Sequence, residues 1–501
     1  MLKTIQNSSF APIGTAPNLL PITKSAYLQY LACPPEFWYL KHFPEEYSGA
    51  PDEVALHTME QGNELDQLAR DYYVQSDNLQ VDIQQKFKSG RLLAKADIVL
   101  TETGTRSKTL IEVKSGTSVK PEYLDDLAFQ VIAAEAVGIS FDQIGVLHVN
   151  SAYVFNGTLN IQELFVFEDV TEAVLALIPE TQGNIEAAIQ YLQAPEPVMH
   201  LHEYCGQKLD CPVIQKQHPN LPDYSVFDIS RINAAKLRDL LKNGLVDIHQ
   251  VPNNFDISPK QRLQVEVAQT DMPIVNKRGI KTALDGLQFP LYFLDYETLV
   301  YGVPFYEGIK PYQQMVFQWS LHVLHADGIT IEHFDFLSDG NGAPSMAFAQ
   351  ALQQAIPRNG GSVLVWNKAF EIPRNNELAQ MYPEFEPFMT DINARVYDLM
   401  EIFQQQHFVH PAFKGSCSIK QVLPVVAPHL SYHDLEINHG MLASIRWFEL
   451  VTGKFPDSEK DLLFTNLREY CKLDTLAMVE VYKYLRIVCN QLNASAQISQ
   501  S

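Results

Sequence analysis

The chain has 501 residues, of which 46% are hydrophobic, and a formal net charge of −22 at pH 7. This length predicts two or three domains, each with enough apolar residues for its own core, and the composition excludes a wholly disordered chain. The negative charge excludes a protein coated with positive charge, so any contact with nucleic acid has to use a local basic groove.

The N-terminal part of the chain is predicted to form one α/β domain. After a loose arm, apolar residues at helical spacing predict helices over residues 22–43 and 53–73. Two apolar segments at residues 91–100 and 109–113, joined by polar residues, are typical of a β-hairpin. The remaining predicted elements are a helix and two strands, at residues 123–137, 144–149 and about 153–167.

Charged residues on the predicted hairpin form the first candidate site. Glu112 and Lys114 are two residues apart on one strand, so their side chains share a face. Asp97 on the preceding strand can lie opposite them, and Gln130 lies one helix later. Neighbouring carboxylates suit Mg²⁺ or Mn²⁺, and a lysine beside them can orient or deprotonate the attacking water. Most isolated Glu-x-Lys triplets are exposed pairs on a strand, so the neighbouring residues carry the interpretation.

These residues resemble the catalytic core of the PD-(D/E)xK nuclease superfamily, specifically its RecB-like and Cas4-like branch. The opening segment TKSAYLQYLACPPEFWY also resembles the start of Cas4-like nucleases. The resemblance implies a restriction-endonuclease-like α/β domain. It also implies that Asp97 and Glu112 bind the metal ion and that Lys114 and Gln130 are catalytic.

Two departures from this family pattern concern the helices around the site. Many members have a metal-binding histidine on the first helix, whereas this chain offers Glu64 or Asp66. A tyrosine often follows the helix glutamine by one turn, whereas this chain has Ala134. The departures affect the first-helix ligand and leave the core residues in place.

Cysteines at both ends of this domain resemble part of an iron–sulfur site. Cas4-like nucleases bind a cluster with one early and three later cysteines, and Cys33, Cys205 and Cys211 match three of these. The fourth is expected near Gln217, and the adjacent His218 can substitute because imidazole can replace a thiolate on iron. The alternative is that Cys33 is a small core residue and the others are loop residues.

The second half of the chain is predicted to form a connector and a second α/β domain. Residues 225–286 lack a strong strand pattern and predict short helices broken at Gly244 and Pro252. The strands and final helix that follow are predicted at residues 291–294, 316–324, 330–336, 363–366 and 465–484. The chain is thus expected to be an α/β multidomain protein, with domains at residues 1–224, a helical connector at 225–286, a mixed-sheet domain at 287–490 and a flexible tail at 491–501.

Acidic residues from three distant segments form the second candidate site. Asp295 and Glu297 end an apolar strand and share a face, Glu371 opens a later helix, and Asp474 lies one helical turn after Tyr470. Like charges repel, so folding alone does not favour their convergence. Convergence of several acids is required, however, where two metal ions about 3.5–4 Å apart bind the attacking and leaving oxygens of a phosphodiester. In isolation, each segment is also compatible with an ordinary acidic strand end or helix face.

The order and spacing of these residues resemble the DnaQ-like, ribonuclease H-fold 3′–5′ exonucleases of the DEDDy type. The resemblance implies that the four acids bind the metal ions and that Tyr470 positions the attacking water. The family normally has aspartate where Glu371 stands. Nearby Asn367, Lys414 and Lys420 are interpreted as substrate contacts, and the irregularly spaced histidines as surface or capping residues.

Together the two halves resemble a bacterial family of uncharacterised two-nuclease proteins. The predicted function is a metal-dependent nuclease that acts on ends or single strands of DNA, in genome maintenance or defence, with 3′–5′ exonuclease activity in the C-terminal domain. Two alternatives stay open: a catalytically decayed scaffold that binds nucleic acid, and an RNA exonuclease. The expected cofactors are Mg²⁺ or Mn²⁺, with an iron–sulfur cluster if the altered ligand set holds one.

The cysteine content and the first residues of the sequence indicate the cellular compartment of the protein. Six cysteines are too few for a disulfide scaffold, and the first residues carry polar side chains and prolines where a secretory signal needs an apolar run. No stretch of the sequence approaches the roughly 18 apolar residues that span a bilayer. The sequence therefore predicts a soluble, cytoplasmic protein with no membrane partner.

Overall fold

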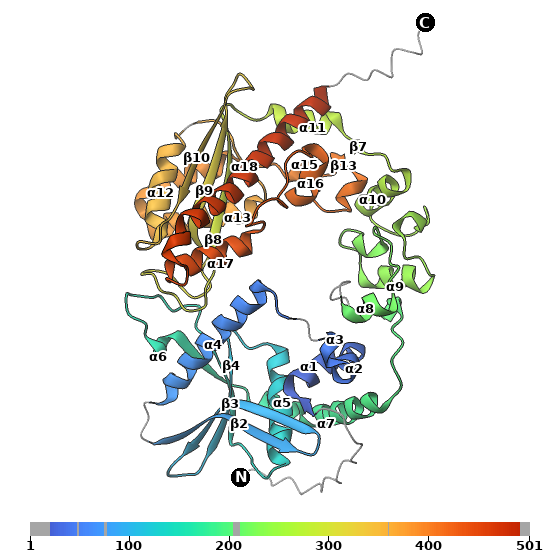
Figure 1. The fold of residues 1–501 in the computed structure, drawn as a ribbon, viewed down its shortest axis with the longest axis vertical. Coiled ribbons are helices and arrows are strands. Elements are labelled where there is room, and N and C mark those ends of the chain that lie inside the picture. Colours follow the sequence, from blue (N-terminus) through green and yellow to red (C-terminus); the bar gives the residue numbers. More distant parts are fainter. Residues whose placement is uncertain (1–20, 48–49, 75–77, 204–210, 359, 491–501) are drawn as a thin grey trace. The chain divides into compact units, whose positions relative to one another are not determined.

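The computed structural model of the protein describes residues 21–47, 50–74, 78–203, 211–358 and 360–490 (Figure 1). The chain divides into two compact units: residues 1–219 with 301–312, and residues 220–300 with 313–501. Each unit contains helices and a β-sheet, which confirms a mixed α/β protein. The predicted N-terminal arm and C-terminal tail lie outside the described residues.

A six-stranded sheet forms the centre of the first unit (Figure 1). Its strands are β1 (Ile22–Thr23), β2 (Leu79–Ser89), β3 (Leu92–Glu102), β4 (Lys108–Lys114), β5 (Gln143–Val149) and β6 (Phe165–Asp169). The order is β1-β3-β4-β5-β6, with β2 paired to β3. The antiparallel β3–β4 pair confirms the predicted hairpin. The predicted strand over 153–167 is wrong in extent, because a short helix, α6 (Ile161–Leu164), precedes β6.

Helices pack on this sheet, and the first of them are shorter than predicted. They are α1 (Lys24–Ala32), α2 (Pro34–His42), α3 (Pro44–Tyr47), α4 (Glu53–Val74), α5 (Pro121–Glu135), α7 (Thr171–Gln193) and α8 (Pro212–Gln217). The single helix predicted over residues 22–43 is wrong. Cys33 has an extended backbone between α1 and α2, since the residue before a proline is disfavoured in the helical region. Pro34 then starts α2, where its missing N–H costs nothing.

The first unit also contains residues 301–312, which follow a strand of the second unit in the chain. Val303 is buried in the same core cluster as Leu65 of α4. The backbone N–H of Phe155 donates to the carbonyl of Ile309 at 3.1 Å, and the Tyr312 hydroxyl donates to the carbonyl of Ser115. This division differs from the predicted boundaries because sequence patterns do not show which core a connecting segment joins.

A five-stranded mixed sheet forms the centre of the second unit. Its strands are β8 (Leu291–Leu299), β9 (Met315–Leu324), β10 (Ile331–Leu337), β11 (Val363–Val365) and β12 (Val396–Asp398). The order is β10-β9-β8-β11-β12, with β8 antiparallel to β9 and parallel to β11. The four predicted strands are confirmed, whereas the short β12 was not predicted. A separate pair joins β7 (Ile274–Val275) to β13 (Phe408–Val409).

Helices cover both faces of this sheet, and the packing of β8 shows toward which face its two acidic side chains point. The helices are α9 (Ala234–Lys242), α10 (Pro259–Thr270), α11 (Lys277–Asp285), α12 (Pro344–Ala355), α13 (Lys368–Met381), α14 (Glu386–Arg395), α15 (Glu401–Gln404), α16 (Ile419–Val426), α17 (Gly440–Val451) and α18 (Lys460–Asn490). Leu291 and Phe293 pack with α11 and α18, whereas Leu294 packs with α12 to α14. Because strand side chains alternate, Asp295 and Glu297 share the α18 face. The predicted connector is not a separate unit, because α11 packs into this core.

Candidate functional site

The four residues predicted for the first site lie together in the first unit. The antiparallel β3–β4 register pairs Ile98 with Ile111. Asp97 and Glu112 are the next residues along the two strands, so they lie side by side. Lys114 Nζ lies 2.8 Å from Glu112 Oε1, and Gln130 Nε2 of α5 donates to Glu112 Oε2 at 2.7 Å. Glu112 is 2% exposed, so its charge is held by these donors rather than by water.

Gln84 of β2 lies opposite Asp97. The pairing of β2 with β3 passes over Gln84, whose φ is 56°, and Gln84 Nε2 lies 3.4 Å from Asp97 Oδ1. The other carboxylate oxygen of Asp97 accepts the backbone N–H of Val113 at 3.0 Å. The positive φ of Gln84 marks a local irregularity of β2 at this point, where its amide lies next to an acid of the site.

Two further charged residues reach this site and were not predicted. Asp126 Oδ2 lies 2.9 Å from Lys114 Nζ, and its Oδ1 accepts from Gln130 at 2.9 Å. Lys24 Nζ lies 2.7 Å from Glu112 Oε1. Asp126 and Gln130 are four apart on α5, so the helical spacing that places Gln130 at the site could also have identified Asp126.

The charges shift the pKa values of these groups in opposite directions. Burial and the charge of Glu112 raise the pKa of Asp97 to about 7, with a smaller contribution from Asp66. Burial opposes ionisation of Glu112, but the ammonium groups of Lys24 and Lys114 outweigh it and lower its pKa to about 2. One carboxylate is thus ionised under all ordinary conditions, and its neighbour titrates near neutral pH.

The two acids considered for the first-helix ligand lie in different surroundings. Glu64 accepts a hydrogen bond from the Tyr301 hydroxyl. Asp66 pairs with Arg70, one helical turn away on α4. Because the charge of Asp66 contributes to the raised pKa of Asp97, Asp66 is the acid of this pair that acts on the site.

The residues considered for an iron–sulfur cluster are not gathered in the described part of the chain. Cys33 is buried between α1 and α2, Cys211 precedes α8, and Cys205 lies outside the described residues. His218 shares a 2.8 Å hydrogen bond with the carbonyl of Met199. Among the described residues, no group of three metal-ligand atoms within 4.8 Å includes these side chains.

Gln217 stands where the fourth cysteine was expected and makes structural hydrogen bonds. Its Nε2 donates to the Tyr39 hydroxyl at 2.9 Å and to the carbonyl of Pro197 at 2.7 Å. Its Oε1 accepts the backbone N–H of Met199 at 2.7 Å. The amide therefore ties the segment before α8 to α2 without a metal.

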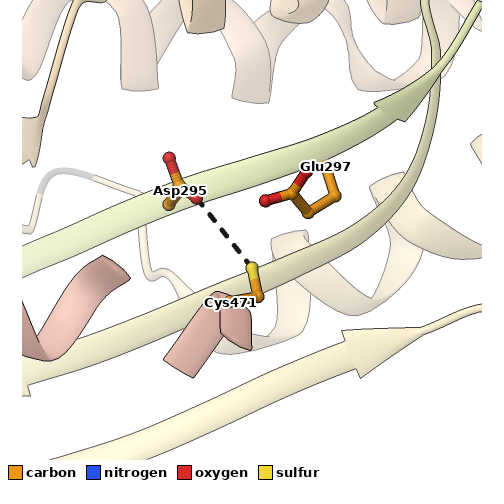
Figure 2. Close-up of side chains that lie close together, drawn as sticks. All are labelled: Asp295, Glu297 and Cys471. Carbon is orange, nitrogen blue, oxygen red and sulfur yellow. Dashed lines mark hydrogen bonds between the residues drawn. The ribbon is translucent and has the colours of Figure 1, made fainter. Parts of the chain in front are cut away.

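The second site brings acids of β8 against α18. Asp295, Glu297 and Cys471 each offer a ligand atom, and these atoms lie within 4.8 Å of one another (Figure 2). Cys471 Sγ lies 4.0 Å from Asp295 Oδ2. Cys471 is fully buried, and its sulfur faces the carboxylates.

Asp474 and two tyrosines extend this group. Asp474 is 9% exposed, and its Oδ1 accepts a 2.6 Å hydrogen bond from the Tyr432 hydroxyl. Lys420 Nζ donates to the carbonyl of Asn438 at 2.8 Å and lies 5.3 Å and 5.7 Å from the ring centres of Tyr432 and Tyr470. Lys420 was predicted as a substrate contact and lies beside the acids, whereas Tyr432 was not predicted.

Burial and mutual repulsion raise the pKa values of the acids in the second unit. Burial and then the charge of Asp474 raise the pKa of Asp295. Burial and then the charge of Asp295 raise the pKa values of Glu297 and Glu371. Burial raises the pKa of Asp474 to about 6, although hydrogen bonding by Tyr432 and the charge of Lys420 oppose the rise. These shifts link all four predicted acids electrostatically.

Glu371 lies in the first turn of α13 and carries an unsatisfied oxygen. The residue is 1% exposed, and its Oε2 is buried without a hydrogen-bond partner. Asn367 precedes the helix with φ 90°, and its backbone N–H donates to Asp398 Oδ1 at 3.0 Å. Asp398 thus accepts hydrogen bonds from the start of α13, while Glu371 Oε2 accepts none.

The other predicted polar residues have structural partners. Lys414 Nζ lies 2.7 Å from Asp223 Oδ2, so the structure places it on that carboxylate rather than on the acids of β8. His439 accepts the backbone N–H of Leu442 and caps α17, which confirms a capping histidine. Gly440 follows it, and a Cβ there would lie 3.2 Å from Glu297 Oε2.

The donor sets of both groups fit a hard divalent cation. Oxygen ligands predominate, several are buried, and Glu371 Oε2 and Gln130 Oε1 have no hydrogen-bond partner. Buried acids with raised pKa values are costly unless a cation compensates their charge. Among the described residues, Asp295 and Glu297, with Cys471, are the ligands whose atoms lie within 4.8 Å of one another. Further oxygen ligands outside that group are Asp97, Glu112 and Asp126 in the first unit and Glu371 and Asp474 in the second.

Comparison with known proteins finds one family model that is similar to part of the chain. Residues 292–418 match a family described as a domain of unknown function, DUF2779. An "Uncharacterized protein UU173" of Ureaplasma parvum serovar 3 is 24% identical over 292 residues, which cover 53% of this chain and 41% of that protein. The chain therefore spans about two fifths of the length of this relative. None of the described helices combines the length and apolar character needed to cross a membrane.

Proposed function

We propose that the chain is a divalent-metal-dependent nuclease with one phosphodiesterase site in each unit. The observation that carries the proposal is the set of four electrostatically linked acids in the second unit, Asp295, Glu297, Glu371 and Asp474. Their burial has no benefit for folding, whereas two-metal phosphodiester hydrolysis requires such a set. Two of them, Asp295 and Glu297, lie on the central strand of a mixed sheet, which supports the resemblance to ribonuclease H-like exonucleases.

In this proposal the residues of the second unit have separate tasks. The bound ions supply Lewis-acid stabilisation and an activated water. The four carboxylates hold those ions, and the Tyr470 hydroxyl orients the water toward the phosphate. Lys420 adds positive charge beside the acids, which favours binding of a phosphate despite the net charge of the chain.

The first unit is proposed to hydrolyse phosphodiesters by the PD-(D/E)xK arrangement. Asp97 and Glu112 hold the ion. Lys114, whose Nζ lies 2.8 Å from Glu112 Oε1, acts on the attacking water. Gln130 fixes the orientation of Glu112 through the 2.7 Å hydrogen bond to Oε2. The proposed substrate is DNA, as single strands or ends, in genome maintenance or defence.

Nuclease assays of four full-length proteins test the proposal. Wild type, Lys114→Ala, Asp295→Asn and the double variant are incubated with labelled single- and double-stranded DNA and RNA in the presence of Mn²⁺. Each single variant should keep the activity of the other unit, and the double variant should keep none. Equal activity in all four proteins would contradict the assignment, and wild type that binds nucleic acid without cleaving it would favour a scaffold.

A further inference from the structure

Lys24 is positioned at the N-terminal acids by a short strand. The two residues of β1 pair in parallel with β3, with Ile22 opposite Leu92 and fully buried. Thr23 then caps α1, accepting the backbone N–H of Ala26 at 3.2 Å. These contacts fix the first residue of α1, Lys24, so its side chain is directed by the sheet rather than by a loop.

The Lys24 ammonium group lies among three carboxylates. Nζ is 2.7 Å from Glu112 Oε1, 3.8 Å from Asp126 Oδ2 and 3.9 Å from Asp97 Oδ1. The two acids assigned to the metal ion, Asp97 and Glu112, are therefore both within 4 Å of one ammonium nitrogen. A cation already lies where these carboxylates converge.

Both oxygens of Glu112 are occupied in this arrangement. Oε1 accepts from Lys24 and Lys114, and Oε2 accepts from Gln130. An ion coordinated by Glu112 therefore has to replace one of these donors. Lys114 has a second close contact, 2.9 Å to Asp126 Oδ2, whereas the second contact of Lys24 is 3.8 Å long. Lys24 is the donor whose replacement costs less.

We propose that Lys24 is a built-in counter-ion of the N-terminal site, which a divalent ion displaces when it binds to Asp97 and Glu112. The inference rests on the proposed function, because it describes how metal loading of that site is controlled. When the metal ion binds, it replaces the Lys24 ammonium group at the carboxylates, and this ammonium group moves to the edge of the site. The freed ammonium group, charged throughout, is then available to a phosphate of the substrate.

Magnesium binding measured by calorimetry tests this displacement. The full-length chain carries Asp295→Asn and Glu297→Gln, so that the N-terminal site dominates binding. Lys24→Met in this background keeps the length of the side chain and removes the competing charge. Opposite charges about 4 Å apart interact strongly in a protein environment, so we expect the affinity for Mg²⁺ to rise at least about tenfold.

Two matched variants accompany Lys24→Met. Lys24→Arg keeps the positive charge and should bind Mg²⁺ about as tightly as the parent protein. Lys120→Met removes an exposed lysine whose nearest carboxylate, Glu122, is 4.0 Å away, and it should leave the affinity unchanged. An unchanged or weaker affinity in Lys24→Met would overturn the proposal, because a merely structural lysine gives that result.

Amine labelling of the unaltered chain provides a second measurement that does not depend on the folding of a variant. Acetic anhydride labels exposed lysine amines, and mass spectrometry quantifies each site. Lys24 should be labelled slowly without metal and several-fold faster at saturating Mg²⁺, whereas Lys120 should not change. Labelling of Lys24 that is insensitive to bound Mg²⁺ would reject displacement.

The failure of this inference is distinguishable from that of the proposed function. Displacement by Mg²⁺ in a chain that does not cleave nucleic acid supports the counter-ion and rejects the nuclease. Cleavage that depends on Lys114, with the same Mg²⁺ affinity in Lys24→Met and the parent, supports the nuclease and rejects the counter-ion. No Mg²⁺ binding in either protein rejects the counter-ion and the metal site proposed for the first unit.

Discussion

The acids of the two units are compensated in different ways. In the first unit, Lys24 and Lys114 place ammonium groups 2.7 and 2.8 Å from one oxygen of Glu112. In the second unit, Lys420 donates instead to the carbonyl of Asn438 and acts on the acids from farther away. The pKa of Glu112 is accordingly lowered, whereas burial and mutual repulsion raise those of Asp295 and Glu297. Ammonium groups thus compensate the acids of the first unit, and we expect the acids of the second unit to depend more strongly on a bound metal ion.

The largest expected effect is the loss of a ligand in the second unit. Asp474→Asn keeps the volume of the side chain and removes a charge, so exonuclease activity should fall by at least about 10³-fold, consistent with a required metal ligand. Glu469→Gln is the matched control, because Glu469 lies on the same helix and is exposed. Initial rates on a single-stranded 3′-end substrate give the comparison, and similar losses in both variants would contradict the ligand assignment.

The two tyrosines near Asp474 are expected to have different roles. Tyr470 acts on the attacking water, whereas Tyr432 orients the Asp474 carboxylate. Tyr470→Phe should slow turnover by about 10²–10⁴-fold, the usual range for a positioned proton-transfer group, with little change in metal affinity. Tyr432→Phe removes the 2.6 Å hydrogen bond to Asp474 and should lower the rate by about tenfold or less. Steady-state rates and Mn²⁺ titrations distinguish them. A larger effect at Tyr432 would exchange the two roles.

Metal affinity of the N-terminal site should depend on pH through Asp97. Its pKa is about 7, so below pH 7 the ion has to displace a proton, whereas above pH 7 the carboxylate is already ionised. We expect Mg²⁺ affinity to fall about tenfold per pH unit below pH 7 and to level off above pH 8. Calorimetry in buffers of different ionisation enthalpy measures the released proton. Affinity independent of pH between 5.5 and 7 would show that Asp97 is not a ligand.

Thermal unfolding tests the dependence of the second site on metal. The pKa of Asp474 is about 6 when folded and about 3.9 in an unfolded chain. The folded protein therefore holds a proton that the unfolded chain loses as pH rises from 4 to 6, and the free energy of unfolding falls across that window. Metal-free protein should melt roughly 5 °C lower at pH 7.5 than at pH 5. Mg²⁺ should restore most of the difference at pH 7.5, and little of it in Asp474→Asn.

The smallest predicted effect concerns the space beside Glu297. A Cβ at Gly440 would lie 3.2 Å from Glu297 Oε2 and 3.8 Å from the Tyr470 hydroxyl. Gly440→Ala should weaken Mn²⁺ binding by a few fold, since the carboxylate has to shift slightly. Gly183→Ala on α7, where a Cβ meets nothing within 4 Å, is the control and should bind like wild type. Tighter binding in Gly440→Ala would contradict this geometry.

Local periodicity predicted much of the two sites. The alternation of strand residues placed Glu112 with Lys114 and Asp295 with Glu297, and helical spacing placed Tyr470 near Asp474. The strands β3, β4, β8 and β9 and the helices α4, α5 and α18 followed from the same patterns, whereas β2 and α7 were not predicted. The chemical role of each of these residues stays a prediction.

Long-range pairing explains what the sequence did not predict. Lys24 reaches Glu112 because β1 pairs with β3, a contact between residues about seventy apart that no local pattern encodes. Tyr432 meets Asp474 from a segment with no periodic signal. Residues 301–312 join the first unit although they follow β8 in the chain. Each case depends on which segments pack together rather than on spacing along one element.

The direct test of the nuclease assignment is product analysis from a single-stranded DNA with a free 3′ end, in Lys114→Ala with Mn²⁺. We expect stepwise release of nucleoside 5′-monophosphates from the 3′ end, strong inhibition by a 3′ block, and loss of all products when Asp295→Asn is added. Degradation of the 3′-blocked strand at the normal rate, or activity that survives Asp295→Asn, would contradict it.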